Sequence, residues 1–522
     1  MTALAQGSAG IALVICFALL RTRQVKAAAL LLLAQCAAVA VAAMAQHRPE
    51  LAPAPLLLGG AVWVKRHRTA VLGLLAPPLG GPTFGVLVGA VLAALCQSQG
   101  DLAQPLAILL LAALLATTRP HAVMQVMALV VAQNGVVLAA SHLPVPPVTA
   151  IAGLLLPLPL LAALMAGHPR PGWHATPARP RQWLCWVCVA LSAGIFAATL
   201  TAPLDPLAAV FAPLFGFEGL LRAWIQRRRT GRAPLSQAAA VARTGCVVLA
   251  VGATDPLLAW MAILGAMTAA LLPVLERRWQ SATLGFYGAA LALFGLSAGG
   301  VLGFPGLLAG YAVMAVVVPD LAAPLAVLVL RQVDGAIWSP AAAWLTSLAA
   351  VGGLLGCAAL LRHATCRHRV TMLHLAQVSI ALLAIGLDRP DGRYAAMVLL
   401  ILLTLTRAAS RAGHSLAAAL ATAGLGGVPP LGVFPALCLV MLAVGGQAPW
   451  LLLPLGAALV LIVPASLPAR LPVQDLIPLF APGRRAALLS AAWLPLALAA
   501  MIGFMTPDSL ARWLQALTAG AS

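Results

Sequence analysis

The sequence predicts an all-α, polytopic integral membrane protein: a helix bundle with about 16–19 transmembrane helices and one clear broken helix. Apolar stretches long enough to cross the hydrocarbon core of a bilayer recur along all 522 residues. Hydrophobic residues make up 62% of the chain and charged residues 8%, whereas a soluble domain has about 25% charged residues. This composition excludes a soluble enzyme, a disordered chain and a secreted disulfide scaffold.

The charge is strongly positive, with 31 Lys and Arg against 12 Asp and Glu. The basic residues gather in short loops, as at 227–232 and 362–369, and such loops are typical of the cytoplasmic side of a membrane protein. Aromatic residues do not alternate with them as a nucleic-acid groove requires. The expected surroundings are therefore a lipid bilayer, with no nucleic acid as partner. Arg21, Arg23 and Lys26 follow the first apolar stretch, which predicts a retained span whose C-terminal end lies inside.

A proline- and arginine-rich segment at 168–182, HPRPGWHATPARPRQ, predicts a linker between two membrane blocks, 1–167 and 183–522. The first block holds about six or seven candidate spans and the second about ten to twelve.

A broken helix is predicted in the second block. The apolar segment 415–445 is too long for one span and is interrupted by Gly426, Gly427, Pro429 and Pro430. Interrupted helices persist inside membranes only where protein buries them or where they line a polar cavity. This segment is therefore the first candidate functional region.

Three acids remain as candidates inside the membrane once those in loops and at span ends are set aside: Glu218, Asp320 and Asp334. Glu218 lies four residues before Arg222, and Asp334 three after Arg331, so each could pair along a helix face. An ionisable residue within a span is a functional candidate by default. Snorkelling of both pairs to the membrane interface is the simpler account.

The sequence predicts no catalytic centre, no cofactor and no metal site. A GxSxG match at 295–299 lies within an apolar span, where small residues pack helices rather than form a nucleophile elbow. The His and Cys residues of the basic segment 363–368 lack a nearby carboxylate or second cysteine. Cysteine spacing typical of an iron–sulfur cluster is missing from the sequence. Membership of an enzyme complex stays open.

Several stretches of the second block resemble the antiporter-like subunits of respiratory complex I and its relatives. AGLGGVPPLGVF at 423–434 resembles the AGxPPFxxF break of that family, and the best agreement is with the F-type membrane component of hydrogenase-4 and formate hydrogenlyase complexes. In the same order, 255–274, 276–295 and 310–319 resemble three further spans of the F-type component, and 372–407 resembles two more.

The first block resembles a neighbouring membrane component of hydrogenase-4, the E type. TRPHAVMQV at 118–126, followed by Gln133-Asn-Gly, is similar to the R-H-x-x-x-Q-V…E-N-G pattern of the E type. The resemblance covers about half the chain and implies an E-type block fused to an F-type block. It implies a bacterial inner membrane, with other membrane and peripheral subunits of a hydrogenase- or complex I-like assembly as partners.

The chain departs from the family at the positions that the resemblance assigns to proton transfer. Acids, lysines and one tyrosine of the family are replaced there by apolar or amide side chains, an arginine or a histidine. Under an ungapped local alignment these positions are Leu264, Gln280, Met314, Leu437 and Gln133, with Arg407 at a late lysine and His374 at a tyrosine.

These substitutions predict a degenerate proton channel. A charge at the bilayer centre costs about 2.5–3.5 kcal/mol on insertion scales, and Leu, Met and Gln remove both this cost and the titratable groups. Arg407 keeps a positive charge but does not release its proton. His374 and His414 are titratable, yet two histidines make no continuous row.

The sequence leaves three candidate functions. The first is a structural membrane-arm subunit in which Arg407 and the broken helix persist as packing features. The second is an active proton or cation channel that uses Arg407, His374, His414 and water. The third is an independent secondary transporter, which predicts an inverted repeat and broken helices in both halves.

Overall fold

The computed structural model describes most of residues 3–142, 180–271, 303–467 and 484–516, apart from short gaps. Within these residues the regular structure is helical, apart from one isolated bridge residue, Gln24. Seven helices are long and apolar enough to cross a membrane, and shorter apolar helices accompany them. The protein is an all-α, polytopic membrane helix bundle, as the hydropathy pattern predicts.

Proline begins many of these helices, because its fixed φ suits the first helical position and its missing N–H is not needed there. The chain divides into two compact units, Met1–Ala198 with Arg232–Gly300, and Thr199–Gly231 with Val301–Ser522. These boundaries differ from the predicted linker at 168–182, which lies outside the described residues up to 179. The division into two family blocks therefore stays a prediction.

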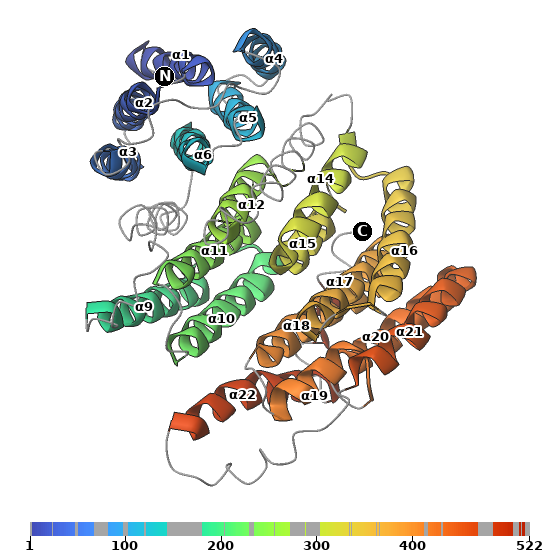
Figure 1. Cartoon of the computed structure of the whole chain (residues 1–522). Coiled ribbons are helices and arrows are strands. Elements are labelled where there is room, and N and C mark those ends of the chain that lie inside the picture. The colour runs from blue at the N-terminus through green and yellow to red at the C-terminus, as the bar shows by residue number, and fades with distance from the viewer. Residues whose placement is uncertain are drawn as a thin grey trace. The chain divides into compact units, whose positions relative to one another are not determined.

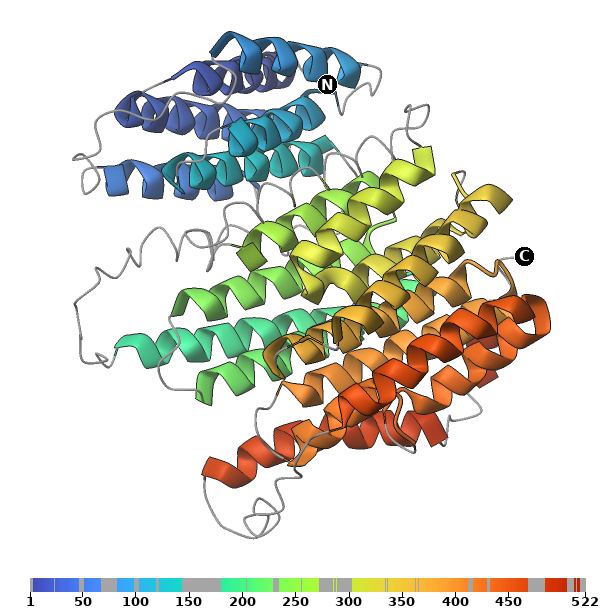
Figure 2. The ribbon, with the colours of Figure 1, turned by 45° about the vertical axis from the view of Figure 1, so that its right-hand side comes forward.

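In the described part of the first unit, helices α1 to α6 lie side by side (Figure 2). Helix α2 packs against α1, α3 and α6, while α5 packs against α1, α4 and α6. Further along the chain, α11 packs against α12, which also contacts α6. The helices are α1 (Ala3–Arg21), α2 (Val25–Ala45), α3 (Pro53–Arg66), α4 (Pro82–Leu95), α5 (Ala103–Thr118), α6 (Ala122–His142), α9 (Pro180–Thr201), α11 (Pro234–Gly252) and α12 (Pro256–Leu271).

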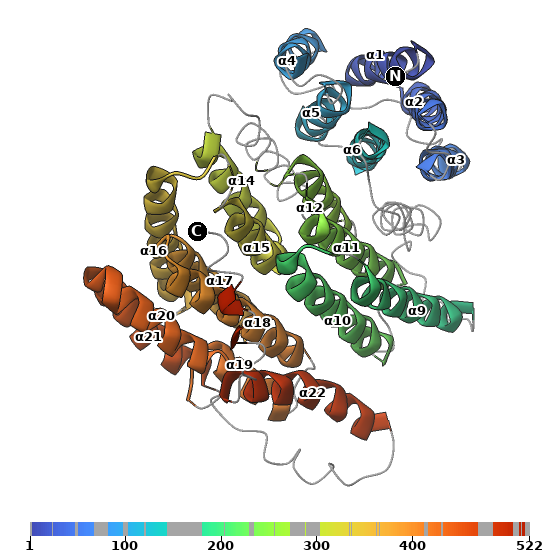
Figure 3. The ribbon, with the colours of Figure 1, turned by 180° about the vertical axis from the view of Figure 1, so that it is seen from behind.

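The second unit surrounds helix α18, which lies between α10, α17 and α19 when seen from the front and from behind (Figures 1 and 3). It packs against these three helices and against α15, α20 and α22. The unit contains α10 (Pro206–Arg228), α14 (Gly303–Val317), the 3-10 turn η4 (Pro319–Leu321), α15 (Ala322–Gln332), α16 (Pro340–Leu361), α17 (Cys366–Ile385), α18 (Pro390–Ser410), α19 (Leu416–Leu425), α20 (Phe434–Gln447), the 3-10 turn η5 (Pro449–Leu451), α21 (Leu452–Ser466) and α22 (Arg484–Phe504).

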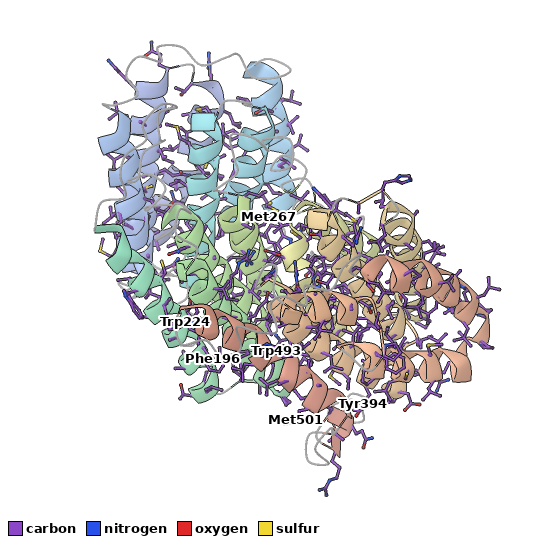
Figure 4. All side chains as sticks on the ribbon, turned by 60° about the horizontal axis from the view of Figure 1, so that its bottom comes forward. Phe196, Trp224, Met267, Tyr394, Trp493 and Met501 are labelled. Carbon is purple, nitrogen blue, oxygen red and sulfur yellow. The ribbon has the colours of Figure 1, made fainter. Side chains whose placement is uncertain are left out.

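Helices α18 and α22 run antiparallel. The two helices pack together, and Figure 4 labels Tyr394 of α18 with Trp493 and Met501 of α22. A Cβ at Gly503, near the end of α22, would lie 3.6 Å from Leu402 Cδ1 in the middle of α18. At the other end Ala409 of α18 packs against Leu496 of α22, with Trp493 beside them. The C-terminal half of α18 is thereby enclosed by apolar side chains.

The predicted broken helix is present as α19 and α20, separated by the turn 426–433. Gly427 and Gly432 have φ values of +81° and +58°, which favour glycine because it lacks a Cβ. Backbone groups at the turn bond to one another: Val428 N–H donates to Ala423 and Val433 N–H donates to Gly424. These bonds tie both ends of the interruption to the last turn of α19.

The apolar stretch 304–331 forms two helices, α14 and α15, that reverse direction. Phe304 at the start of α14 contacts Trp338 beyond the end of α15, with ring centroids 5.3 Å apart. At 1.5 Å per residue, α14 and α15 laid end to end would separate these rings by tens of ångströms. The chain must turn back at η4, which is the tip of an α14–α15 hairpin.

Candidate functional site

A cluster of charged side chains lies where the hairpin tip meets α10 and the end of α18. Asp320 of η4 accepts hydrogen bonds from three guanidinium groups: Arg407 at 2.5 Å, Arg411 at 2.5 Å and Arg222 at 2.8 Å. Arg411 also pairs with Glu218. Three arginines and two carboxylates from three parts of the second unit thus form one network.

Local sequence places each member of this network. Pro319 has no N–H and interrupts the helix, so that Asp320 falls on the turn and at the N-terminal end of α15, where a helix favours negative charge. Glu218 and Arg222 are one turn apart on α10 and so share a face. Arg407 lies in the last turn of α18, and Arg411 caps that helix.

Arg407 is the most enclosed of the three arginines, with a side-chain exposure of 7% against 20% for Arg222 and Arg411. Its Nη1 donates to the Pro319 carbonyl at 3.3 Å and contacts His374 Nε2 at 2.5 Å. A guanidinium can only donate, so His374 Nε2 must accept. The proton of the neutral imidazole therefore lies on Nδ1, which has no hydrogen-bond partner among the described residues.

Arg411 lies just beyond the α18 span. Burial lowers the pKa of its guanidinium, but Asp320 and Glu218 raise it more, and the net pKa lies above the usual value. Both carboxylates therefore favour the charged form of the Arg411 guanidinium.

Helix α17 connects this network to the broken helix. Gln377 lies one turn after His374, is fully buried, and donates from Nε2 to the Leu425 carbonyl at 2.9 Å. Its Oε1 has no partner among the described residues. Beyond this point Leu437 approaches Gly427 so closely that a Cβ there would meet its Cδ1 at 2.5 Å. The contact at the break, between Leu437 and Gly427, is therefore apolar, whereas His374 and Gln377 on α17 are polar.

The residues aligned with the family's proton-transfer positions are buried wherever the structure describes them. Leu264, Met314 and Leu437 are 3%, 0% and 4% exposed, so the apolar side chains pack without leaving a polar group to satisfy. Gln133 is also buried, and its Nε2 has no partner among the described side chains. Four predicted site residues lie outside the described residues: Gln280, His414, Asp334 and Pro430.

Glu218 and Arg222 pair with other elements rather than with each other, and the pairing expected between Arg331 and Asp334 lies outside the described residues. Glu218 pairs with Arg411, and Arg222 pairs with Asp320, although Glu218 and Arg222 have helix-face spacing. Arg331 pairs with Asp205, which caps α10 by accepting from the Ala208 N–H at 2.7 Å. These ion pairs join α10 to α15 and α18. A pair between two helices stabilises their packing as well as the two charged side chains.

Sequence reasoning left Asp320 among three candidate acids and assigned it no partner. Its central position was missed because the three arginines that donate to it are far away in the chain, at separations of 87, 91 and 98 residues. The Pro319-Asp320 pair inside an apolar stretch was the available signal. A proline followed by an acid there favours a turn rather than a continuous helix.

A second polar group, uncharged, lies inside the first unit. Gln35 of α2 donates to Cys16 Sγ at 2.8 Å, and Asn134 of α6 donates to Cys36 Sγ at 3.3 Å and to Gln35 Oε1 at 3.4 Å. Hydrogen bonds of this kind hold membrane helices together. Nowhere in the described part of the chain do three His, Cys, Asp or Glu side chains converge as metal ligands.

Comparison with known proteins gives similarity to solved structures. No protein-family model and no curated protein matches the sequence. A chain of respiratory complex I from Thermus thermophilus, solved with bound NADH, is similar in structure, with a TM-score of 0.50 and 16% identity. The similarity covers 72% of this chain and 100% of that chain. This protein shares the fold of that complex I chain. The resemblance expected from the broken-helix motif is thus supported at the level of fold.

Proposed function

We propose that this chain is a membrane-arm subunit of a hydrogenase-4-like or complex I-like respiratory assembly in a bacterial inner membrane, and that it braces the arm without carrying protons. The fold shared with a complex I chain supports the assembly. The enclosed Arg407 supports the structural role, because its guanidinium is held by Asp320, Pro319 and His374 and does not exchange its proton.

The apolar residues around the broken helix also support a structural role without proton transfer. A proton path needs groups that bind and release protons, or water, across the whole membrane. Here Leu437 fills the turn at Gly427, and Met314 is fully buried on the hairpin. Such a core would resist hydration, so the interruption in the helix serves packing.

Co-purification tests the assembly. The tagged chain is isolated in mild detergent and its companions are identified by mass spectrometry. We expect a nickel–iron hydrogenase-like or complex I-like large subunit, iron–sulfur proteins and further membrane subunits. Arg407→Ala should weaken this recovery, whereas Arg393→Ala, at the other end of α18, serves as the matched control. Isolation of the chain alone or as a homo-oligomer would contradict the proposal and favour an independent secondary transporter.

Proton flux tests the absence of pumping. The purified chain is placed in liposomes with an imposed pH gradient, and an internal dye reports dissipation. We expect no flux above that of empty liposomes, and no change with Arg407→Ala. An ionophore added at the end verifies that the gradient was present.

An active proton or cation channel is the second candidate, and one observation favours it. His374 Nδ1 and Gln377 Oε1 lie one turn apart, fully buried, and neither has a partner among the described residues. A water molecule between them would suit both groups. Flux through the wild type that is lost in Arg407→Ala and His374→Ala would establish this candidate.

A further inference from the structure

The three arginines around Asp320 have the geometry of a receptor for a carboxylate. Arg407 and Arg411 both donate to Oδ1 at 2.5 Å, while Arg222 donates to Oδ2 at 2.8 Å. The donors thus meet the two oxygens of one planar group from both sides. Guanidinium groups match planar carboxylates in shape and charge.

The carboxylate within this receptor belongs to a short turn between two helices. Asp320 lies in the three-residue η4 at the tip of the α14–α15 hairpin, and its side chain is 23% exposed. The arginines come instead from α10 and from the end of α18. Ligand and receptor therefore belong to different elements, and the ligand side chain can be reached from outside.

We propose that Arg222, Arg407 and Arg411 form a carboxylate-binding site and that Asp320 occupies it as a tethered ligand, so that the hairpin tip is a latch on α10 and α18. Tethering gives Asp320 an effective concentration in the millimolar range or above, which keeps free carboxylates out of the wild-type site. When the Asp320 carboxylate is removed, the three guanidinium groups keep Glu218 as the carboxylate beside them among the described residues. A small free carboxylate then binds.

Chemical rescue of Asp320→Ala tests this site. The full-length variant is purified in detergent, and its midpoint of thermal unfolding is measured in sodium acetate and in sodium chloride of equal ionic strength. We expect acetate to raise the midpoint of Asp320→Ala by about 2–4 °C, because a ligand that binds the folded state stabilises it. Wild type should show no difference between the two salts. Acetamide, a neutral molecule of the same shape, should have no effect.

Two further variants separate a specific site from a general salt effect. Asp388→Ala removes a partly exposed acid that pairs with a single arginine, Arg393, at 3.0 Å, so acetate should not rescue it. Asp320→Ala combined with Arg222→Gln should lose the rescue. Asp320→Asn replaces the alanine variant if the latter does not accumulate. Equal midpoints in acetate and chloride, or failure to recover either Asp320 variant in acetate, would overturn the proposal.

Discussion

Arg407 shows how one side chain can join three elements. Its two terminal nitrogens reach the carboxylate of Asp320, the carbonyl of Pro319 and the imidazole of His374. A lysine has the same charge but a single terminal nitrogen, which cannot lie in these directions with the same planar geometry. The arginine is therefore needed for its shape as well as for its charge.

Arg407→Ala should destabilise the protein by about 1.5–3 kcal/mol, the usual loss for a hydrogen bond to a charged group, because Asp320 keeps Arg222 and Arg411 as partners while His374 loses its buried donor. Arg407→Lys should recover only part of this loss. Arg393→Ala removes an ion pair with the more exposed Asp388 and should cost about 0–1 kcal/mol. Unfolding midpoints in detergent measure all three. Equal losses for Arg407→Ala and Arg393→Ala would mean that burial does not decide the strength of these pairs.

At the scale of elements, the two interruptions of the second unit differ in predictability. The break at 426–433 was visible in the sequence because glycines and prolines interrupt an apolar stretch. The reversal at η4 was not, because the apolar stretch continues through a single Pro-Asp pair, and hydropathy does not distinguish one long helix from two short ones. Helices were thus predictable from composition, whereas their directions and ion-pair partners depend on residues far apart in the chain.

Glycine substitutions at the break test its packing. A Cβ at Gly426 would overlap Ser466 of α21, and a Cβ at Gly432 would come within 2.8 Å of the Gly424 backbone. Gly426→Ala should therefore cost about 1–3 kcal/mol through overpacking. Gly352→Ala on α16 is the matched control: no other atom lies within 4 Å of its Cβ, and alanine favours a helix by about 1 kcal/mol. Thermal unfolding should move the two variants in opposite directions.

At the scale of the whole molecule, the charge pattern predicts the orientation of the second unit in the membrane. Helix α16 is a span-length helix whose flanking residues Ser339 and His363 are both exposed. The basic segment 362–369 follows its C-terminal end, so that end should be cytoplasmic. The arginine network around Asp320 should then lie toward the cytoplasmic side, because α17 begins there and His374 is in its first half.

Single cysteines on a cysteine-free background measure this orientation. Ser339→Cys should react with a membrane-impermeant thiol reagent applied to intact cells stripped of their outer membrane. His363→Cys should react only after the inner membrane is opened. The reverse pattern would place the basic segment 362–369 outside and would contradict the predicted orientation of α16.

The hairpin has a consequence for how the protein is made. Helices α14 and α15, with 15 and 11 residues, are each too short to span a bilayer of about 30 Å, and their tip carries a charge. Arg407 emerges from the ribosome 87 residues after Asp320, a delay of roughly 4–17 s at about 5–20 residues per second. Arg222 precedes Asp320 by 98 residues and is already present. Of the three arginines that donate to Asp320, Arg222 is therefore the one available to it before α18 has been synthesised.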